Sequence, residues 1–93
     1  MNLDHRTNSI ENILDNYRPF TMEEFIKKFP LLSTIVITDI NDADSNEISC
    51  TVGYAKNDFV FLGTYLYSLE DLFHNYKYKD PMTNEWVCFG VIR

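Results

Sequence analysis

The spacing of apolar residues predicts two short helices near the start of the chain. In the first, residues 8–17, apolar side chains recur at intervals of three and four residues, which places them on one helical face. The second helix starts after Thr21, an N-cap residue that is followed three positions later by Glu24, as in a capping box. Pro30 ends this helix, because proline cannot continue the hydrogen-bonding pattern.

Three strands are predicted after these helices. Residues 32–39 are rich in β-branched side chains with apolar positions on both faces, which is typical of an inner strand. Residues 47–54 alternate apolar and polar positions, and residues 59–64 form a third apolar run. Polar, turn-forming residues at 41–46 and 56–58 separate the three segments, so we expect an antiparallel meander.

A third helix and a fourth strand complete the predicted fold. The helix begins at Ser68, has Asp71 at its third position and carries Tyr76 on its apolar side. After a turn, residues 85–92 form the last strand. The element order is then ααβββαβ, and we expect an α+β fold in which three helices accompany a four-stranded, mostly antiparallel sheet. Residues 1–93 are few enough to form one acidic domain.

The charge of the chain narrows the choice of partners. Fourteen Asp and Glu residues oppose eight Lys and Arg residues, which gives a net charge of −6. Such a surface repels nucleic acid and anionic lipid, since both are bound through Lys and Arg, and it attracts basic partners. No secretory signal follows Met1, no apolar run approaches the length of a membrane span, and the two cysteines lie in predicted strands. We therefore expect a protein of the reducing cytoplasm.

Patterns for metal binding and catalysis are missing from the sequence. His5 and His74 lie near opposite ends of the chain, and neither has a cysteine at the spacing of a zinc site. Residues 42–46 resemble the start of a calcium loop, but Glu47 and Gly53 stand where the glycine and the last ligand are required. Adjacent acids occur in the first turns of predicted helices, where the helix dipole stabilises them without any catalytic role. The sequence thus predicts a protein that is not an enzyme and binds no metal or other cofactor.

Four tyrosines lie on either side of the predicted third helix. Tyrosine is enriched where proteins meet, and its ring is also used to complete protein cores, so both interpretations stay open. The interface interpretation predicts a contact with a second copy or with another protein. The residues of this predicted patch are Tyr65, Tyr67, Tyr76 and Tyr78.

The acidic residues suggest a surface that imitates a nucleic acid. Acids four positions apart on a helix lie about 6 Å apart, and alternate residues on a strand lie about 6.6 Å apart. Both distances are close to the separation of phosphates along a DNA strand, although a merely solvated acidic face is the common alternative. The carboxylates predicted to form the surface are Glu11, Asp15, Glu23, Glu24, Asp39, Asp42, Asp44, Glu47, Asp58, Glu70 and Asp71.

The whole chain, from Met1-Asn2-Leu3-Asp4-His5-Arg6 to Trp86-Val87-Cys88-Phe89 and Arg93, resembles the Arn anti-restriction proteins of T4-like phages in length, acidity and composition. The resemblance implies a homodimeric DNA mimic that occupies the DNA-binding surface of the restriction endonuclease McrBC and thereby protects phage DNA. It implies no catalytic residues. The alternative function is a non-enzymatic adaptor that binds another protein through the tyrosine patch, with acidity serving only solubility.

Overall fold

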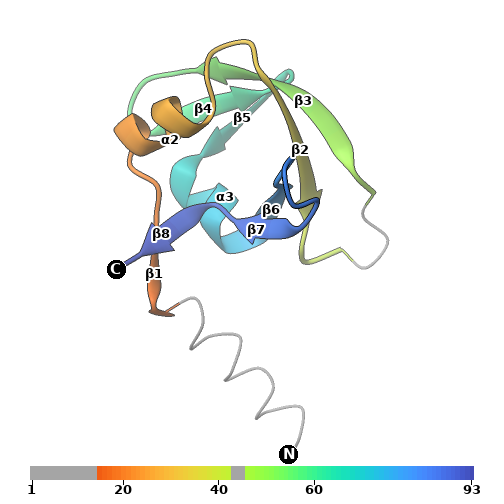
Figure 1. Cartoon of the computed structure of the whole chain (residues 1–93). Coiled ribbons are helices and arrows are strands. Elements are labelled where there is room, and N and C mark those ends of the chain that lie inside the picture. Colours follow the sequence, from red (N-terminus) through yellow and green to blue (C-terminus); the bar gives the residue numbers. More distant parts are fainter. Residues whose placement is uncertain (1–14, 43–45) are drawn as a thin grey trace, which may run out of the picture.

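The computed structural model describes residues 15–42 and 46–93, which form eight strands and two helices (Figure 1). In chain order the elements are β1 (Tyr17–Pro19), α2 (Met22–Lys28), β2 (Thr34–Asp39), β3 (Ile48–Tyr54), β4 (Phe59–Leu62), β5 (Tyr65–Ser68), α3 (Leu69–Asn75), β6 (Tyr76–Lys79), β7 (Trp86–Cys88) and β8 (Gly90–Ile92). Six strands form an antiparallel sheet in the order β5-β4-β3-β2-β6-β7, and β1 pairs with β8 in a second sheet. The prediction of a four-stranded sheet with three helices in the order ααβββαβ is therefore wrong, because the described part of the chain is mostly sheet.

The segment predicted as one strand, residues 59–64, is the first half of a hairpin. Leu62 of β4 pairs with Tyr65 of β5, which leaves a turn of only two residues. Gly63, the first of them, has a φ of +67°. A positive φ at this position is typical of a type II′ turn, whose geometry matches the twist of the flanking strands. The prediction misses β5 because it continues the strand through the glycine.

The predicted third helix is shorter than expected, and a strand follows it directly. α3 ends at Asn75, and Tyr76 is the first residue of β6 rather than part of the helical face. The alternating sequence Tyr-Lys-Tyr-Lys of β6 has the two-residue period of a strand. Tyr78 pairs with Ile37 of β2. The chain thus crosses through α3 from the edge strand β5 to the far side of β2.

The predicted last strand, residues 85–92, divides between the two sheets. The chain breaks at the buried Phe89, so that β7 stays in the large sheet while β8 pairs with β1. Gly90 makes this junction possible, since a Cβ atom there would overlap the backbone carbonyl oxygen of Arg18 and the ring of Phe73. The requirement for glycine is a consequence of tertiary packing that no local pattern shows.

Several local predictions agree with the structure. Strands β2, β3 and β4 form the expected antiparallel meander. Thr21 and Glu24 form the complete capping box of α2, and the hydroxyl of Ser68 accepts a hydrogen bond from the Asp71 backbone N–H at the start of α3. The predicted helix at 8–17 lies almost entirely outside the described residues, and Tyr17 belongs to β1 instead.

An aromatic cluster fills the concave inner side of the large sheet, which is strongly curved in Figure 1. Phe29 is central to it. Its ring centroid lies 4.9 Å from those of Phe25 and Tyr78 and 6.0 Å from that of Phe89. Its carbonyl oxygen accepts a 2.7 Å hydrogen bond from the Tyr54 hydroxyl. This packing fixes α2 against the sheet and holds the strands that carry the surface residues described below.

Candidate functional site: an acidic belt along α3

Two neutral asparagines connect two carboxylates at the end of β2 and on α3. The Asn41 backbone N–H donates to the Asp39 carboxylate at 2.8 Å, and the Asn41 side chain donates to the Asn75 side-chain oxygen at 2.8 Å. The Asn75 amide in turn donates to the Asp71 carboxylate at 2.7 Å. A backbone bond of 3.0 Å from Ile40 N–H to the Asn75 carbonyl oxygen closes the same junction. The positions of Asp39 and Asp71 are thus coupled by uncharged groups.

Further carboxylates lie near α3 and near the end of β2. At the start of α3, Glu70 and Asp58 line the same shallow depression, and the Leu69 backbone N–H donates to the Asp58 carbonyl oxygen at 2.9 Å. At the other end, Asp42 follows Asn41 in the loop after β2 and is exposed. We call these carboxylates the α3 acidic belt; it consists of Asp39, Asp42, Asp58, Glu70 and Asp71.

The belt is drawn from parts of the chain that lack strong bases. Residues 29–55 and residues 57–76 contain no Lys or Arg, and Lys56 alone stands between them. His74 is exposed, and its Nε2 lies 3.8 Å from the Glu70 carboxylate. Residues 57–76 thus contribute Asp58, Glu70 and Asp71 but no Lys or Arg around α3, which makes the local electrostatic potential negative there. At the other end of the belt, Lys77 of β6 pairs with Thr38, next to Asp39.

The other predicted acids do not join the belt. Glu24 forms two hydrogen bonds with the Arg18 guanidinium, at 2.7 and 2.8 Å, and these lower the pKa of Glu24 to about 2. Glu23 lies 3.8 Å from Lys27, and Glu47 lies 2.5 Å from Lys79. Asp15 is exposed beside β1. The remaining two predicted positions, Glu11 and Asp44, lie outside the described residues.

The four predicted tyrosines occupy three different environments. Tyr67 and Tyr76 pack edge to face with ring centroids 5.2 Å apart beside the belt. Burial raises the pKa of Tyr67 to about 12 and also raises that of Tyr76, whose hydroxyl is further affected by the Asp39 carboxylate. Tyr78 is buried in the core, whereas 71% of Tyr65 is exposed. The four rings therefore form no single surface patch.

An uncharged edge, which sequence reasoning missed, adjoins the belt. β5 is an edge strand of the large sheet, and no charged residue occurs between Phe59 and Leu69. Phe61 pairs with Leu66, and these side chains point to the outer face together with Phe59 while Val60 is buried inside. The sequence contains a signal for this edge. Side chains alternate between the two faces of a strand, so a strand that is apolar at every position must leave one apolar face uncovered when only the other face is in the core.

Within residues 15–42 and 46–93, no group of three or more His, Cys, Asp or Glu side chains is arranged to hold a metal ion. Cys50 and Cys88 are free thiols, and burial raises the pKa of each. None of the helices in these ranges has the length and apolar character needed to cross a bilayer. The belt can act through its field and its hydrogen-bond acceptors.

Comparisons of the chain with protein-family models, with curated proteins and with solved structures found no match.

Proposed function

We propose that this protein is a DNA mimic that inhibits a restriction endonuclease of the McrBC type in the bacterial cytoplasm, in the manner implied by its resemblance to the Arn anti-restriction proteins. The α3 acidic belt occupies the basic surface that would otherwise hold DNA, and phage DNA is thereby protected. The observation that supports this proposal most directly is the hydrogen-bonded series Asp39–Asn41–Asn75–Asp71, in which neutral amides hold two acids in place.

The geometry suits a partner that recognises phosphates by position. A DNA-binding protein uses phosphate contacts to set its register on the duplex, so a competitor must present negative groups at fixed places. An asparagine that donates to a carboxylate adds no opposing charge, whereas a Lys or Arg partner offsets the charge of the carboxylate. The Glu24–Arg18 and Glu47–Lys79 pairs are of the second kind, and for that reason we assign them to stability rather than to recognition.

Competition with DNA tests this function. Labelled duplex DNA bound to the purified endonuclease is titrated with the protein, and displacement is followed by fluorescence anisotropy at low and high salt. The double variant Asp58→Asn/Glu70→Gln removes two exposed charges of the belt. At about 1 kcal/mol for each carboxylate facing a basic cleft, we expect about 30-fold weaker competition.

The matched control is Glu23→Gln/Glu85→Gln, which removes the same amount of charge away from the belt. We expect this variant to compete within a factor of two or three of the unchanged protein. Equal losses in the two double variants would mean that only net charge matters, and would exclude a DNA-like surface at α3. Displacement that is as strong in high salt as in low salt would contradict an electrostatic mechanism.

We further propose that two copies associate through the edge of β5. Two molecules of charge −6 repel each other, which favours self-association through a surface without charge, and the edge with Phe61, Tyr65 and Leu66 provides one. Edge strands carry unpaired backbone donors and acceptors, and proteins usually protect them with charged residues or proline, which β5 lacks. Antiparallel pairing of β5 with its copy would place one acidic belt at each end of the joint.

A further inference from the structure

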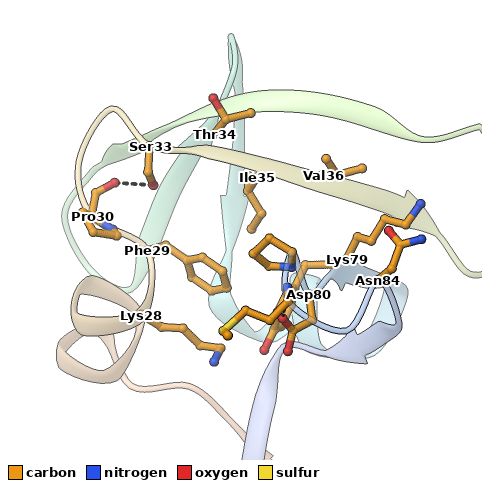
Figure 2. A pocket seen from close by; sticks show the side chains of 13 residues that line it. Lys28, Phe29, Pro30, Ser33, Thr34, Ile35, Val36, Lys79, Asp80 and Asn84 are labelled. Carbon is orange, nitrogen blue, oxygen red and sulfur yellow. Dashed lines mark hydrogen bonds between the residues drawn. The ribbon is translucent and has the colours of Figure 1, made fainter.

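We propose that a groove beside the start of β2 binds an apolar segment of a partner protein in which a carboxylate lies next to a large apolar side chain. The groove lies between the connection from α2 to β2 and the turn from β6 to β7, and it has a volume of about 520 Å³ (Figure 2). This site is separate from the α3 acidic belt, since β2 reaches the groove with Thr34 and the belt with Asp39 at its opposite end.

The inside of the groove is largely apolar. Phe29, Ile35 and Tyr78 line it, and Figure 2 shows Phe29 and Ile35 directed into the space between the two walls. Pro81 and Met82 belong to the opposite wall. A concave, apolar surface of this size accommodates one large aliphatic or aromatic side chain with its neighbours.

Hydrogen bonds hold both walls in place. On the side of α2, the Ser33 hydroxyl donates to the Pro30 carbonyl oxygen at 2.6 Å. On the other side, the Asp80 carboxylate accepts from the Met82 backbone N–H at 2.8 Å, and the Asp80 carbonyl oxygen accepts from the Asn84 N–H at 2.7 Å. Because the groove is already formed, a ligand does not have to order it, which favours binding.

The exposed side chain of Met82 indicates that the partner is a protein. Its side chain is 92% exposed although it stands on a turn whose backbone is fixed by hydrogen bonds. An apolar side chain held in water by a rigid turn is stabilised once another surface covers it. Methionine also adapts its shape to different partners, and it is frequent where proteins bind apolar segments.

Lys28 sets the charge of the bound segment. The other lysine at the groove, Lys79, is paired with Glu47 and lies over the Trp86 ring at 5.5 Å from its centroid. Within the described residues Lys28 makes no ion pair, and its ammonium group lies 5.8 Å from the centroid of the Tyr78 ring. Since Asp80 occupies the opposite wall, a carboxylate on the segment has one favourable position, beside Lys28.

Peptide titrations monitored by NMR on the full chain test this proposal. The probe is an acetylated and amidated peptide, Glu-Leu-Phe-Glu, and its controls are Lys-Leu-Phe-Lys and Glu-Ser-Ser-Glu. We expect shifts of backbone signals around Ile35, Tyr78 and Met82, with at least fivefold tighter binding of the probe than of either control. Lys28→Glu should reverse the preference between the two Leu-Phe peptides, whereas Lys56→Glu, the same change in an exposed turn, should leave it unchanged. Met82→Ser should weaken the binding of both Leu-Phe peptides.

Three results would overturn the proposal. The first is the absence of shifts at millimolar peptide. The second is equal binding of the acidic and basic peptides, which would leave Lys28 without a role. The third is a shift of the groove signals with protein concentration alone, which would identify a second copy as the occupant. None of these outcomes bears on the DNA-mimic proposal, because the belt carboxylates are unchanged in every variant used.

Discussion

Replacing Asn75 with aspartate tests whether the belt is held together as described. In the structure the Asn75 amide donates to the Asp71 carboxylate at 2.7 Å, while its side-chain oxygen accepts from Asn41 at 2.8 Å. Asn75→Asp keeps the acceptor for Asn41 but replaces the donor with a second carboxylate. Asn75→Ala removes both bonds without adding charge, and serves as the reference variant.

The magnitude follows from these contacts. Each lost side-chain hydrogen bond lowers the free energy of unfolding by about 1 kcal/mol, so Asn75→Ala should cost about 1–2 kcal/mol. Two carboxylates about 4 Å apart near a protein surface repel by about 4 kcal/mol, and side-chain relaxation with solvent access reduces this to about 2 kcal/mol. With the lost donor included, Asn75→Asp should cost about 3 kcal/mol at pH 7.5.

The sign of the pH dependence separates the two variants. Repulsion raises the pKa of a carboxyl pair in the folded state, because one shared proton relieves it. The folded form of Asn75→Asp is therefore favoured at low pH, and this stability is lost as the pH rises through the raised pKa of the carboxyl pair. Relative to the unchanged protein, the deficit of Asn75→Asp should fall to about 1 kcal/mol at pH 4, while that of Asn75→Ala should stay constant.

Urea denaturation of the three proteins between pH 4 and 7.5 provides the measurement. If the deficit of Asn75→Asp is the same at both ends of this range, the two side chains do not face each other and the belt lacks the proposed fixed geometry. Comparison with Asn41→Ala supplies an independent check, since that change removes only the outer bond and should cost about half as much as Asn75→Ala.

Three further predictions concern other parts of the molecule. Glu24→Gln should make the free energy of unfolding depend less on pH in the acid range. The lowered pKa of about 2 makes Glu24 a source of stability above pH 4.5 that is lost as the pH falls towards 2. An unchanged dependence on pH in acid titrations would contradict the bidentate pair. Gly90→Ala should lower the free energy of unfolding by about 1–3 kcal/mol and speed amide exchange at Val91, because the added methyl group overlaps the Arg18 backbone and the Phe73 ring; normal exchange there would show that the junction tolerates a side chain. Leu66→Lys should give a monomer by light scattering if β5 joins two copies, whereas Lys56→Glu should not alter the mass.

The sequence predicts local structure well where the responsible residues are adjacent in the chain. Thr21 with Glu24 and Ser68 with Asp71 are helix starts because each cap reaches only three residues ahead. The prediction is wrong where the strand number depends on distant contacts. β8 is separated from β7 because Gly90 lies against Arg18 and Phe73, and β1 is extended because β8 is there to pair with it.

The candidate site shows the same division. Charge counting includes all five carboxylates of the belt among the predicted acids, yet it cannot separate them from Glu24 or Glu47, whose partners Arg18 and Lys79 lie 6 and 32 residues away. The role of Asn41 and Asn75 was not predictable, since nothing in the sequence indicates that residues 34 positions apart share a hydrogen bond. The sequence leaves open whether Tyr65 or Tyr78 faces the core, because a tyrosine-rich segment does not indicate which of its rings are buried.

The absence of charge from β5 has a consequence for how the protein responds to its surroundings. Any contact made through this strand depends on apolar contact and backbone hydrogen bonding, which added salt weakens little and sulfate strengthens. Contacts made by the carboxylates along α3 weaken as salt is added, because the screening distance shrinks from about 10 Å at 0.1 M to about 3 Å at 1 M. If both proposals hold, ionic strength alone would release the basic partner while leaving two copies of this chain together.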